Sequence, residues 1–430
     1  MKRWTLLAAA AAIALAIPAF ADVSVQNVTA TQRYPWNGLV DIDYEVVCDD
    51  PAADVWVYAT GFDKDANVSM GVRAISGDGA NAPVKPGKHR MTWDVTSDYP
   101  GFNSTAFTVK MTALTGGAPY MVVDLSGGVD ALSYPVSYLS SVPAGGWTDE
   151  YKGDKLVLRL IPPGTFMMGS PSDELGREPS TYYGGTSKET RHLVTLTKPF
   201  YIGIFELTQR QWSLVMGTEK PTSAGSYTTK GNTHPAQGVS YNDIRGTVNG
   251  AAWPAHNQVD ANSFMGRLRS KANMMFDLPT EAQWEYACRA GTATALNNGK
   301  ELTTTGANRC ANLDEVAWYS PRSGNKPTWC GRFRENAWGI YDMHGNVIEW
   351  CLDWNNTDLG SSATINPTGA LSGTSRVLRG GGIYYYNPSY GWGRTEFCRS
   401  AARMKEKPNS SINSDDSCGF GFRVVCLPAD

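Results

Sequence analysis

The stretch Asn336–Trp350 reads Asn-Ala-Trp-Gly-Ile-Tyr-Asp-Met-His-Gly-Asn-Val-Ile-Glu-Trp, with two glycines and two carboxylates among aromatic residues. Its spacing fits neither an amphipathic helix nor a regular half-buried strand. Glycines beside tryptophans indicate irregular backbone held by side-chain packing, with or without a bound ion. A hard cation such as Ca²⁺ takes carboxylate oxygens, here those of Asp342 and Glu349, and carbonyl oxygens, here those near Gly345 and Val347. The alternative is an aromatic loop packed without metal.

The composition of the whole chain is that of a globular protein. Of 430 residues, 42% are hydrophobic and 18% are charged, and the length allows two or three domains. Fourteen tryptophans and 44 glycines indicate loop-rich structure built on aromatic anchors. The formal net charge is −3 and no block of lysine and arginine stands out, so nucleic acid is not an expected partner.

Residues 1–21 have the pattern of a signal peptide. Lys2 and Arg3 precede the apolar run Leu6–Ile17, and Ala19-Phe20-Ala21 has the small residues of a cleavage site. The run is too short to favour a transmembrane helix. We therefore expect an exported chain, in the periplasm, at the cell surface or secreted, with no transmembrane helix after cleavage. A retained N-terminal anchor is the alternative.

Short alternating strands indicate an all-β accessory domain at residues 22–115. Apolar and polar residues alternate in Val23–Thr29, Val40–Val46, Asp54–Ala59 and Phe107–Thr112, and turn residues separate these runs. The spacing predicts an immunoglobulin-like or fibronectin-like sandwich of about seven strands. The segment gathers no catalytic side chains, which favours an accessory or adhesion role.

A second domain is expected at residues 156–430. A connector at residues 116–155, rich in Gly, Ser and Pro, precedes it and contains one possible strand at Tyr120–Leu125. The segment Leu156–Ser170 predicts a hairpin-like start, and Val194–Gly203 returns to strand character.

Three helices are predicted in the second domain. Thr208–Gly217 and Thr280–Gly291 each begin with a Thr-x-x-Gln capping box and end at a glycine. Asn262–Ala272 is the third helix, and it places Phe264 and Leu268 on one inward face.

Five motifs resemble those of the formylglycine-generating enzyme (sulfatase-modifying factor) family, and they occur in the family's order over roughly Leu156–Cys426. They are Pro279–Gly291, Asn336–Trp350, Arg376–Gly382, Arg399–Arg403 and Gly419–Arg423. The resemblance implies an α+β fold, the family's compact variant of the C-type lectin fold, with much irregular structure.

The resemblance also implies an active site that this chain lacks. The family's enzymes oxidise a cysteine of sulfatases, using a serine and two copper-binding cysteines after a Gly-Gly turn, because thiolates hold Cu(I). Here Gly382 stands for the serine, Tyr385 for the first cysteine, and Tyr390 or Gly391 for the second. A second branch of the family binds iron through histidines, but none of the five histidines shows helical i, i+4 pairing. Copper and iron are not expected, and the interpretation leans away from an enzyme.

For calcium, the resemblance implies a site formed by Asp342, the carbonyls of Gly345 and Val347, and Glu349. The family has asparagine in the position of Asp342, an exchange that hard-cation chemistry tolerates. A second family site begins with residues that match Asn312-Leu313, but its later ligands have no clear match in this chain.

The cysteines give one expected disulfide. In the resembling family a cysteine in the position of Cys288 is bonded to one two residues before the position of Cys426, which implies a Cys288–Cys426 bond here. Cys48 is expected to be buried and unpaired, and the other five of the eight cysteines cannot be paired from sequence.

The segment that replaces the copper site is rich in tyrosine, asparagine and serine, which supply rigid contact area and adaptable hydrogen bonds. The predicted ligand-binding surface consists of Tyr384, Tyr385, Tyr386, Asn387, Tyr390 and Trp392. The alternative is an ordinary polar loop. The favoured function is a calcium-stabilised, non-catalytic domain that binds a protein, peptide or glycan at the cell envelope. The alternatives are a metal-dependent oxidoreductase with relocated catalytic residues and a structural envelope protein.

Overall fold

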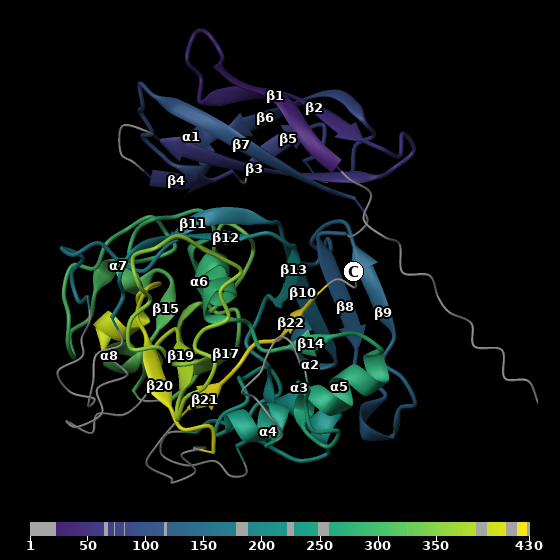
Figure 1. Cartoon of the computed structure of the whole chain (residues 1–430), viewed down its shortest axis with the longest axis vertical. Coiled ribbons are helices and arrows are strands. Elements are labelled where there is room, and N and C mark those ends of the chain that lie inside the picture. Colours follow the sequence, from purple (N-terminus) through teal and green to yellow (C-terminus); the bar gives the residue numbers. More distant parts are fainter. Residues whose placement is uncertain are drawn as a thin grey trace, which may run out of the picture.

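The computed structural model describes residues 23–63, 68–72, 74–80, 82–115, 118–177, 188–221, 228–247, 258–324, 326–383, 394–409 and 419–427. These residues form a sheet-rich structure with short helices and much irregular backbone (Figure 1). Residues 23–115 make up the upper part in Figure 1, and the residues from 118 onward make up the larger, lower part. Among the described helices, none is both long and apolar enough to cross a bilayer.

The upper part consists of two sheets around one hydrophobic cluster. The first sheet has the order β1 (Val23–Gln32), β2 (Leu39–Cys48), β6 (Gly87–Asp94), β5 (Ile75–Gly77), and the second has the order β4 (Val68–Gly71), β3 (Val55–Asp63), β7 (Phe107–Thr115). A short helix, α1 (Val95–Asp98), follows β6. The four predicted strands are confirmed by β1, β2, β3 and β7. The alternation places Ile42, Trp93 and Met111 in the shared core, because every second side chain points inward.

The main sheet of the larger part has six strands. Their order is β14 (Phe276–Asp277), β22 (Val425–Cys426), β13 (Phe200–Gly203), β10 (Lys155–Ile161), β8 (Tyr120–Asp124), β9 (Val136–Leu139). The possible strand at Tyr120–Leu125 is confirmed by β8, which pairs antiparallel with β10. The segment at residues 116–155 therefore supplies two strands of this sheet as well as α2 (Asp149–Gly153).

Smaller sheets and helices complete the larger part. The sheets are β11 (Gly164–Met168), β12 (His192–Leu196), β18 (Thr364–Ile365); β15 (Ala317–Trp318), β16 (His344–Gly345); and β20 (Met404–Glu406), β19 (Arg376–Arg379), β17 (Ile348–Trp354), β21 (Phe420–Gly421). The helices are α3 (Gln209–Met216), α4 (Tyr241–Arg245), α5 (Phe264–Ala272), α6 (Glu281–Arg289), α7 (Ala311–Asp314) and α8 (Ser320–Ser323), with 3₁₀ turns at Gly128–Asp130 and Thr395–Cys398.

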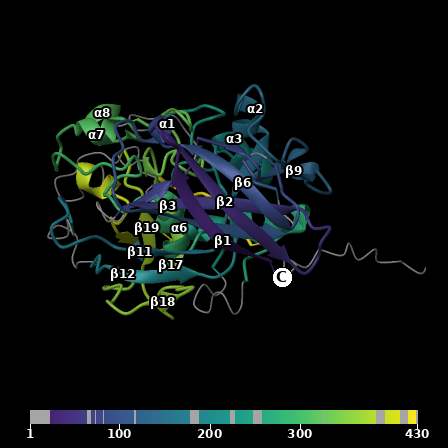
Figure 2. The ribbon, with the colours of Figure 1, turned by 90° about the horizontal axis from the view of Figure 1, so that it is seen from above.

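The two parts are in contact through named side chains. The Arg159 guanidinium of β10 lies 5.9 Å from the ring centroid of Tyr58 in β3 and 4.8 Å from that of Tyr120 in β8. Leu114 of β7 belongs to the main core cluster of the larger part. Seen from above, β1, β2 and β3 lie across the larger part (Figure 2). These contacts hold the upper part against the larger one.

The predicted hairpin at Leu156–Ser170 is wrong. The segment does contain two strands, but β10 pairs with β8 and β13, whereas β11 pairs with β12 in a different sheet. Pro162 and Pro163 separate the two strands. Because proline has no N–H and a fixed φ, it ends pairing with a neighbour and redirects the chain.

The predicted helices are confirmed, with one shifted end. Thr208 and Thr280 form reciprocal capping boxes with glutamines three residues later, at the starts of α3 and α6. Helix α3 ends at Gly217, in the left-handed conformation. Helix α6 ends one residue earlier than predicted, since Ala290, with φ +43°, takes the left-handed position before Gly291. Helix α5 buries Phe264 completely, as the inward face requires.

The expected Cys288–Cys426 disulfide is also wrong, because both cysteines are free thiols in the structure. Cys426 belongs to the main core cluster of the larger part, together with Val424. Its neighbour Val425 belongs to the second cluster, together with Cys288. The strand alternation therefore turns Cys426 away from Cys288. The Cys288 sulfur instead lies 3.6 Å from the Ser400 hydroxyl oxygen.

We expect both thiols to react with iodoacetamide when the purified protein is unfolded in guanidinium without reductant. Peptide mass spectrometry should find Cys288 and Cys426 alkylated to the same extent with and without prior reduction, because no S–S bond protects them. A linked Cys288–Cys426 peptide that disappears on reduction would contradict this prediction.

Candidate metal centre

Asn336 anchors the irregular stretch that opens the sequence analysis. Its side-chain nitrogen donates to the carbonyl oxygens of Ala287 (2.7 Å) and Cys288 (3.2 Å), at the end of α6. Its side-chain oxygen accepts from the backbone N–H groups of Trp338 (2.9 Å) and Ile340 (3.2 Å). One buried amide thus fixes both the turn of this loop and its position against α6.

Three side chains from distant segments meet behind this loop. Glu206, Cys330 and Asp342 are buried, and their candidate ligand atoms lie within 4.8 Å of one another. Glu206 follows β13, and its carboxylate accepts from the backbone N–H of Val347 (3.0 Å) and from the Asn346 side chain (2.6 Å). In the described part of the chain, this is the group of acidic, histidine or cysteine side chains that could hold a metal ion.

The charges of this cluster are only partly balanced. Burial, followed by the charges of Asp342 and Glu349, raises the pKa of Glu206 well above its usual range. Burial also raises the pKa of Asp342 to about 6, although the charge of Arg423 opposes the shift. Two neighbouring buried carboxylates are stable only if one holds a proton or a cation lies between them. The cluster therefore needs either a retained proton or a bound cation.

The chemistry of the donors selects the kind of cation. Carboxylate oxygens suit Ca²⁺ and other hard ions, and Glu206 and Asp342 both supply them. The Cys330 thiol is a soft donor, and burial raises its pKa well above the usual range, which keeps it protonated. The residues present fit calcium through their oxygens, with the thiol as a neighbour.

The predicted calcium residues are not all brought together. Asp342 is a member of the cluster. Val347 is connected to the cluster by its backbone N–H, which donates to the Glu206 carboxylate. Glu349 instead accepts from Arg423 Nε and from Trp284 Nε1, each at 2.7 Å, and from Arg423 Nη2 at 2.5 Å. Glu349 thus forms a buried ion pair with Arg423. Its charge still acts on the cluster, because it contributes to the raised pKa of Glu206.

The other predicted site residues lie elsewhere or outside the described residues. Asn312 and Leu313 belong to α7, where the Asn312 side chain donates to the carbonyl of Glu301 (2.8 Å) and Leu313 is buried in a hydrophobic cluster. The predicted ligand-binding residues Tyr384, Tyr385, Tyr386, Asn387, Tyr390 and Trp392 are all outside the described residues.

His344 lies in the same loop as the candidate centre but is held by the backbone. Its Nδ1 is 2.6 Å from the carbonyl oxygen of Cys398, and its Nε2 is 3.0 Å from the amide nitrogen of Asn297. The first contact requires a proton on Nδ1 and the second a lone pair on Nε2. Burial lowers the pKa of His344 to about 4, so this imidazole is neutral and structural.

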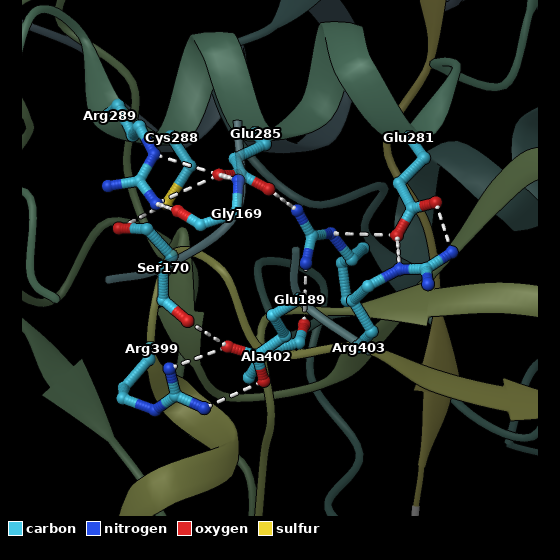
Figure 3. A network of polar contacts seen from close by, with 12 residues as sticks. Gly169, Ser170, Glu189, Glu281, Glu285, Cys288, Arg289, Arg399, Ala402 and Arg403 are labelled. Carbon is cyan, nitrogen blue, oxygen red and sulfur yellow. Dashed lines mark hydrogen bonds and ion pairs between the residues drawn. The ribbon is translucent and has the colours of Figure 1, made fainter. Parts of the chain in front are cut away.

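A second polar network explains three of the family motifs (Figure 3). Glu285 of α6 accepts from the N–H of Gly169 and from Arg289 Nε, each at 2.9 Å, and it pairs with Arg379 of β19. Glu281, one turn earlier, accepts from Arg403 Nε (2.6 Å) and Nη2 (2.8 Å). The inward face of α6 therefore bonds arginines of the two later motifs.

The same network reaches the polar segment that precedes β12. Arg399 donates to both oxygens of Glu189, at 2.9 and 2.8 Å, and to Glu174 at 2.5 Å. The Arg399 and Glu189 side chains are almost fully buried. Such bidentate pairs satisfy charge and hydrogen bonding together, which a buried ion needs.

Sequence reasoning missed Glu206, Cys330 and these carboxylate–arginine pairs. Glu206 is 141 positions from the amide that it accepts from, so no local spacing connects them. A signal for the network was present in α6, where Glu281 and Glu285 lie one turn apart on a helix that also carries Ala282, Trp284, Tyr286, Ala287 and Cys288. Carboxylates inside such a segment indicate buried partners.

Asp353 of β17 borders this network and should make stability depend on pH. It accepts from the N–H of Glu281 (2.8 Å), and burial, followed by the charge of Glu281, raises its pKa to about 7. Between pH ~4 and ~7 the folded protein keeps a proton that the unfolded chain releases, so stability falls as pH rises through this window.

The substitution Asp353→Asn removes this titration and keeps an oxygen for the Glu281 N–H. Urea titrations from pH 4 to 8 should show the free energy of unfolding of the wild type falling relative to the variant by up to about 1.4 kcal/mol per pH unit. Parallel pH profiles for the two proteins would contradict the assignment.

Comparison with known proteins gives a consistent picture. Residues 149–427 match the family model of the sulfatase-modifying factor enzyme 1-like domain. The chain is 31% identical over 299 residues to the formylglycine-generating enzyme of Streptomyces coelicolor, an alignment that covers 62% of this chain and 87% of that enzyme. It is 32% identical over 195 residues to the chaperone protein LppX of Paenibacillus barcinonensis, covering 37% of this chain and 64% of LppX.

A second formylglycine-generating enzyme and a solved structure also match. The chain spans 64% of the formylglycine-generating enzyme of Thermomonospora curvata, at 32% identity. Among solved structures, variable protein 1 of Treponema denticola aligns with a TM-score of 0.46 at 24% identity, over 64% of this chain and 96% of that one. Because the family model covers residues 149–427 and the S. coelicolor enzyme is matched over most of its length, this chain belongs to the formylglycine-generating enzyme (sulfatase-modifying factor) family.

Proposed function

We propose that this protein is an exported, calcium-stabilised member of the family that binds a protein, peptide or glycan at the cell envelope and does not perform the family's copper chemistry. The observation that carries the proposal is the loss of the thiol pair, because Tyr385 and Tyr390 or Gly391 stand in the positions of the two cysteines. Without two cysteines in these positions, the family's soft ligand pair for Cu(I) is missing there.

The cysteines on either side of the replaced segment do not compensate for that loss. Cys351 and Cys398 are both fully buried, and burial raises the pKa of each thiol. A buried, protonated thiol is a poor metal ligand and a poor nucleophile. Both therefore act as small core residues.

Three further observations support the wider proposal. The pattern Met1–Ala21 supports export. The two N-terminal sheets around one core support an immunoglobulin-like or fibronectin-like sandwich, and the short strands and irregular loops of the larger part support the family's C-type-lectin-like fold. The relative from P. barcinonensis bears the name of a chaperone.

For calcium, we propose that the carboxylates of Asp342 and Glu206 and the carbonyls of Gly345 and Val347 hold the ion, while Glu349, bonded to Arg423 and Trp284, lies beside it and is not a ligand. The support is the buried position of Glu206 next to Asp342 and the raised pKa of both groups. A bound Ca²⁺ neutralises charge that the arginines leave unbalanced. The ion contributes stability here and no redox chemistry.

The calcium proposal predicts metal-dependent stability. After dialysis against a chelator, the melting temperature should fall, and Ca²⁺ at a hundred times its dissociation constant should restore about 2.7 kcal/mol. Asp342→Asn should abolish the response and Glu206→Gln should weaken it, whereas Asp154→Asn, the same change at an exposed carboxylate, should keep it. An unchanged response in Asp342→Asn would refute the site. Elemental analysis that finds stoichiometric copper or iron would favour the oxidoreductase alternative.

The ligand-binding proposal predicts a localised loss of binding. Tyr385→Ala and Tyr390→Ala should reduce binding on glycan and peptide arrays at least about tenfold with unchanged melting temperature, because each removes a large contact surface. Tyr34→Ala is the matched control, since Tyr34 is 98% exposed on the other part of the molecule. Unchanged binding in the two loop variants would refute the surface. Arrays without any bound ligand would favour the structural-protein alternative.

A further inference from the structure

A cleft of about 690 Å³ lies between the two parts of the molecule. Strands β3 and β7 line it from the upper part, and β11 and the end of α6 line it from the larger part, as their positions in Figure 1 suggest. Its volume falls in the range of small-molecule sites. None of its described lining residues belongs to Tyr384–Trp392.

The upper wall of the cleft is a polar strand face. Thr108, Lys110 and Thr112 alternate along β7 and therefore share one face, and Thr60 of β3 is the direct partner of Lys110. The opposite face of β7 carries Met111, which is buried in the core of the upper part. The face turned to the larger part is thus rich in hydroxyl groups. An apolar face in this position would pack directly against the larger part and leave no cleft.

The lower wall is aromatic. The ring of Tyr286 lies 5.1 Å from that of Phe166 and 4.8 Å from that of Trp338, measured between centroids. Gly164 leaves room for Tyr286, because a Cβ on Gly164 would lie 2.0 Å from the phenol oxygen. Phe166 and Trp338 are partly exposed. The exposed part of each ring borders the cleft.

The Tyr286 hydroxyl has an unmet hydrogen-bonding capacity. The residue is only 8% exposed, and within the described residues its phenol oxygen has no hydrogen-bond partner. The phenol oxygen itself remains accessible to solvent from the cleft. A polar group of a ligand in the cleft would replace water as its hydrogen-bond partner.

The cleft is also positively charged. Lys110 and Arg191 line it, and neither makes an ion pair or side-chain hydrogen bond with any described residue. The described lining contains no aspartate or glutamate, although the chain has a formal charge of −3. The third cation, Arg289, is already used by Glu285 and by the carbonyl of Gly169. Two free cations therefore face a site without a carboxylate.

We propose that this cleft binds a short acidic oligosaccharide, independently of the Tyr384–Trp392 surface. Its carboxylates pair with Lys110 and Arg191, and its ring faces stack on Phe166 and Trp338. The threonine hydroxyls and the Tyr286 hydroxyl bond its hydroxyl groups. Hydroxyl-rich and aromatic walls together match a sugar, which presents hydroxyls at its edges and C–H groups on its faces, better than they match an acidic peptide.

Titration calorimetry of the full mature chain with trigalacturonate tests this proposal. Lys110→Glu and Arg191→Glu should each weaken binding about tenfold or more, because each replaces a charge-assisted hydrogen bond by repulsion. Lys88→Glu is the matched control, since it makes the same charge change on an exposed residue of β6 outside the cleft, and it should leave the affinity within about twofold. Equal losses in all three variants would indicate general electrostatic attraction and overturn the site.

Further arms separate the ligand classes and the two proposed surfaces. Tyr286→Phe removes only the hydroxyl and should weaken binding several-fold at an unchanged melting temperature. Neutral maltotriose should bind more weakly than trigalacturonate. Tighter binding of hexaglutamate would replace the saccharide by an acidic peptide, and no binding of trigalacturonate would overturn the proposal. Loss of trigalacturonate binding in Tyr385→Ala would move the ligand to the loop, whereas retained binding there leaves the cleft assignment standing even if the loop binds nothing.

Discussion

Buried pairing of arginine with carboxylate is the constraint on which the larger part depends. Glu285 with Arg379, Glu281 with Arg403, Glu189 with Arg399 and Glu349 with Arg423 join strands and loops that have little regular pairing of their own. Because charges removed from water are costly, each pair is stable only when both partners are present and fully bonded, and loss of one partner costs about 3–5 kcal/mol. Such pairs make an irregular fold specific, since a shifted loop would leave an unpaired ion in the core. In three of these four pairs both partners lie in family motifs, and in the fourth Arg399 pairs with Glu189 outside them.

Local signals in the sequence were sufficient where short-range chemistry decides the structure. The capping boxes at Thr208 and Thr280 and the alternation in the N-terminal strands predicted elements that the structure contains. They were insufficient where partners are chosen over long distances. The segment around Pro162 contains two strands as expected, but the sheets that accept them are decided by β8, β12 and β13. Likewise Cys426 lies on a strand as assumed, and only the orientation of that strand between two core clusters decides which residue faces Cys288.

The candidate metal centre divides in the same way. Asp342 was predictable because the loop around it carries a recognisable spacing of glycine, carboxylate and aromatic residues. Glu206 and Cys330 were not, because each is an isolated polar residue in its own segment and becomes meaningful only when the chain brings it to Asp342. Arg423 links the two findings, since it pairs with Glu349 and also opposes the rise that burial causes in the pKa of Asp342. The charge network and the candidate ion site are therefore one electrostatic system, because Arg423 acts on carboxylates of both.

The position of β22 has a consequence for how this molecule is assembled. This two-residue strand lies between β13 and β14 in the main sheet, so the sheet is incomplete until Val425 and Cys426 dock. Arg423, two residues before β22, pairs with Glu349. The Glu349–Arg423 ion pair therefore cannot form until this segment docks. During synthesis from the N-terminus, the ribosome releases this segment long after β8 and β10 have emerged. The main sheet and the Glu349 ion pair can therefore be completed only after this C-terminal segment has emerged, and such pairing between distant parts of a chain forms slowly.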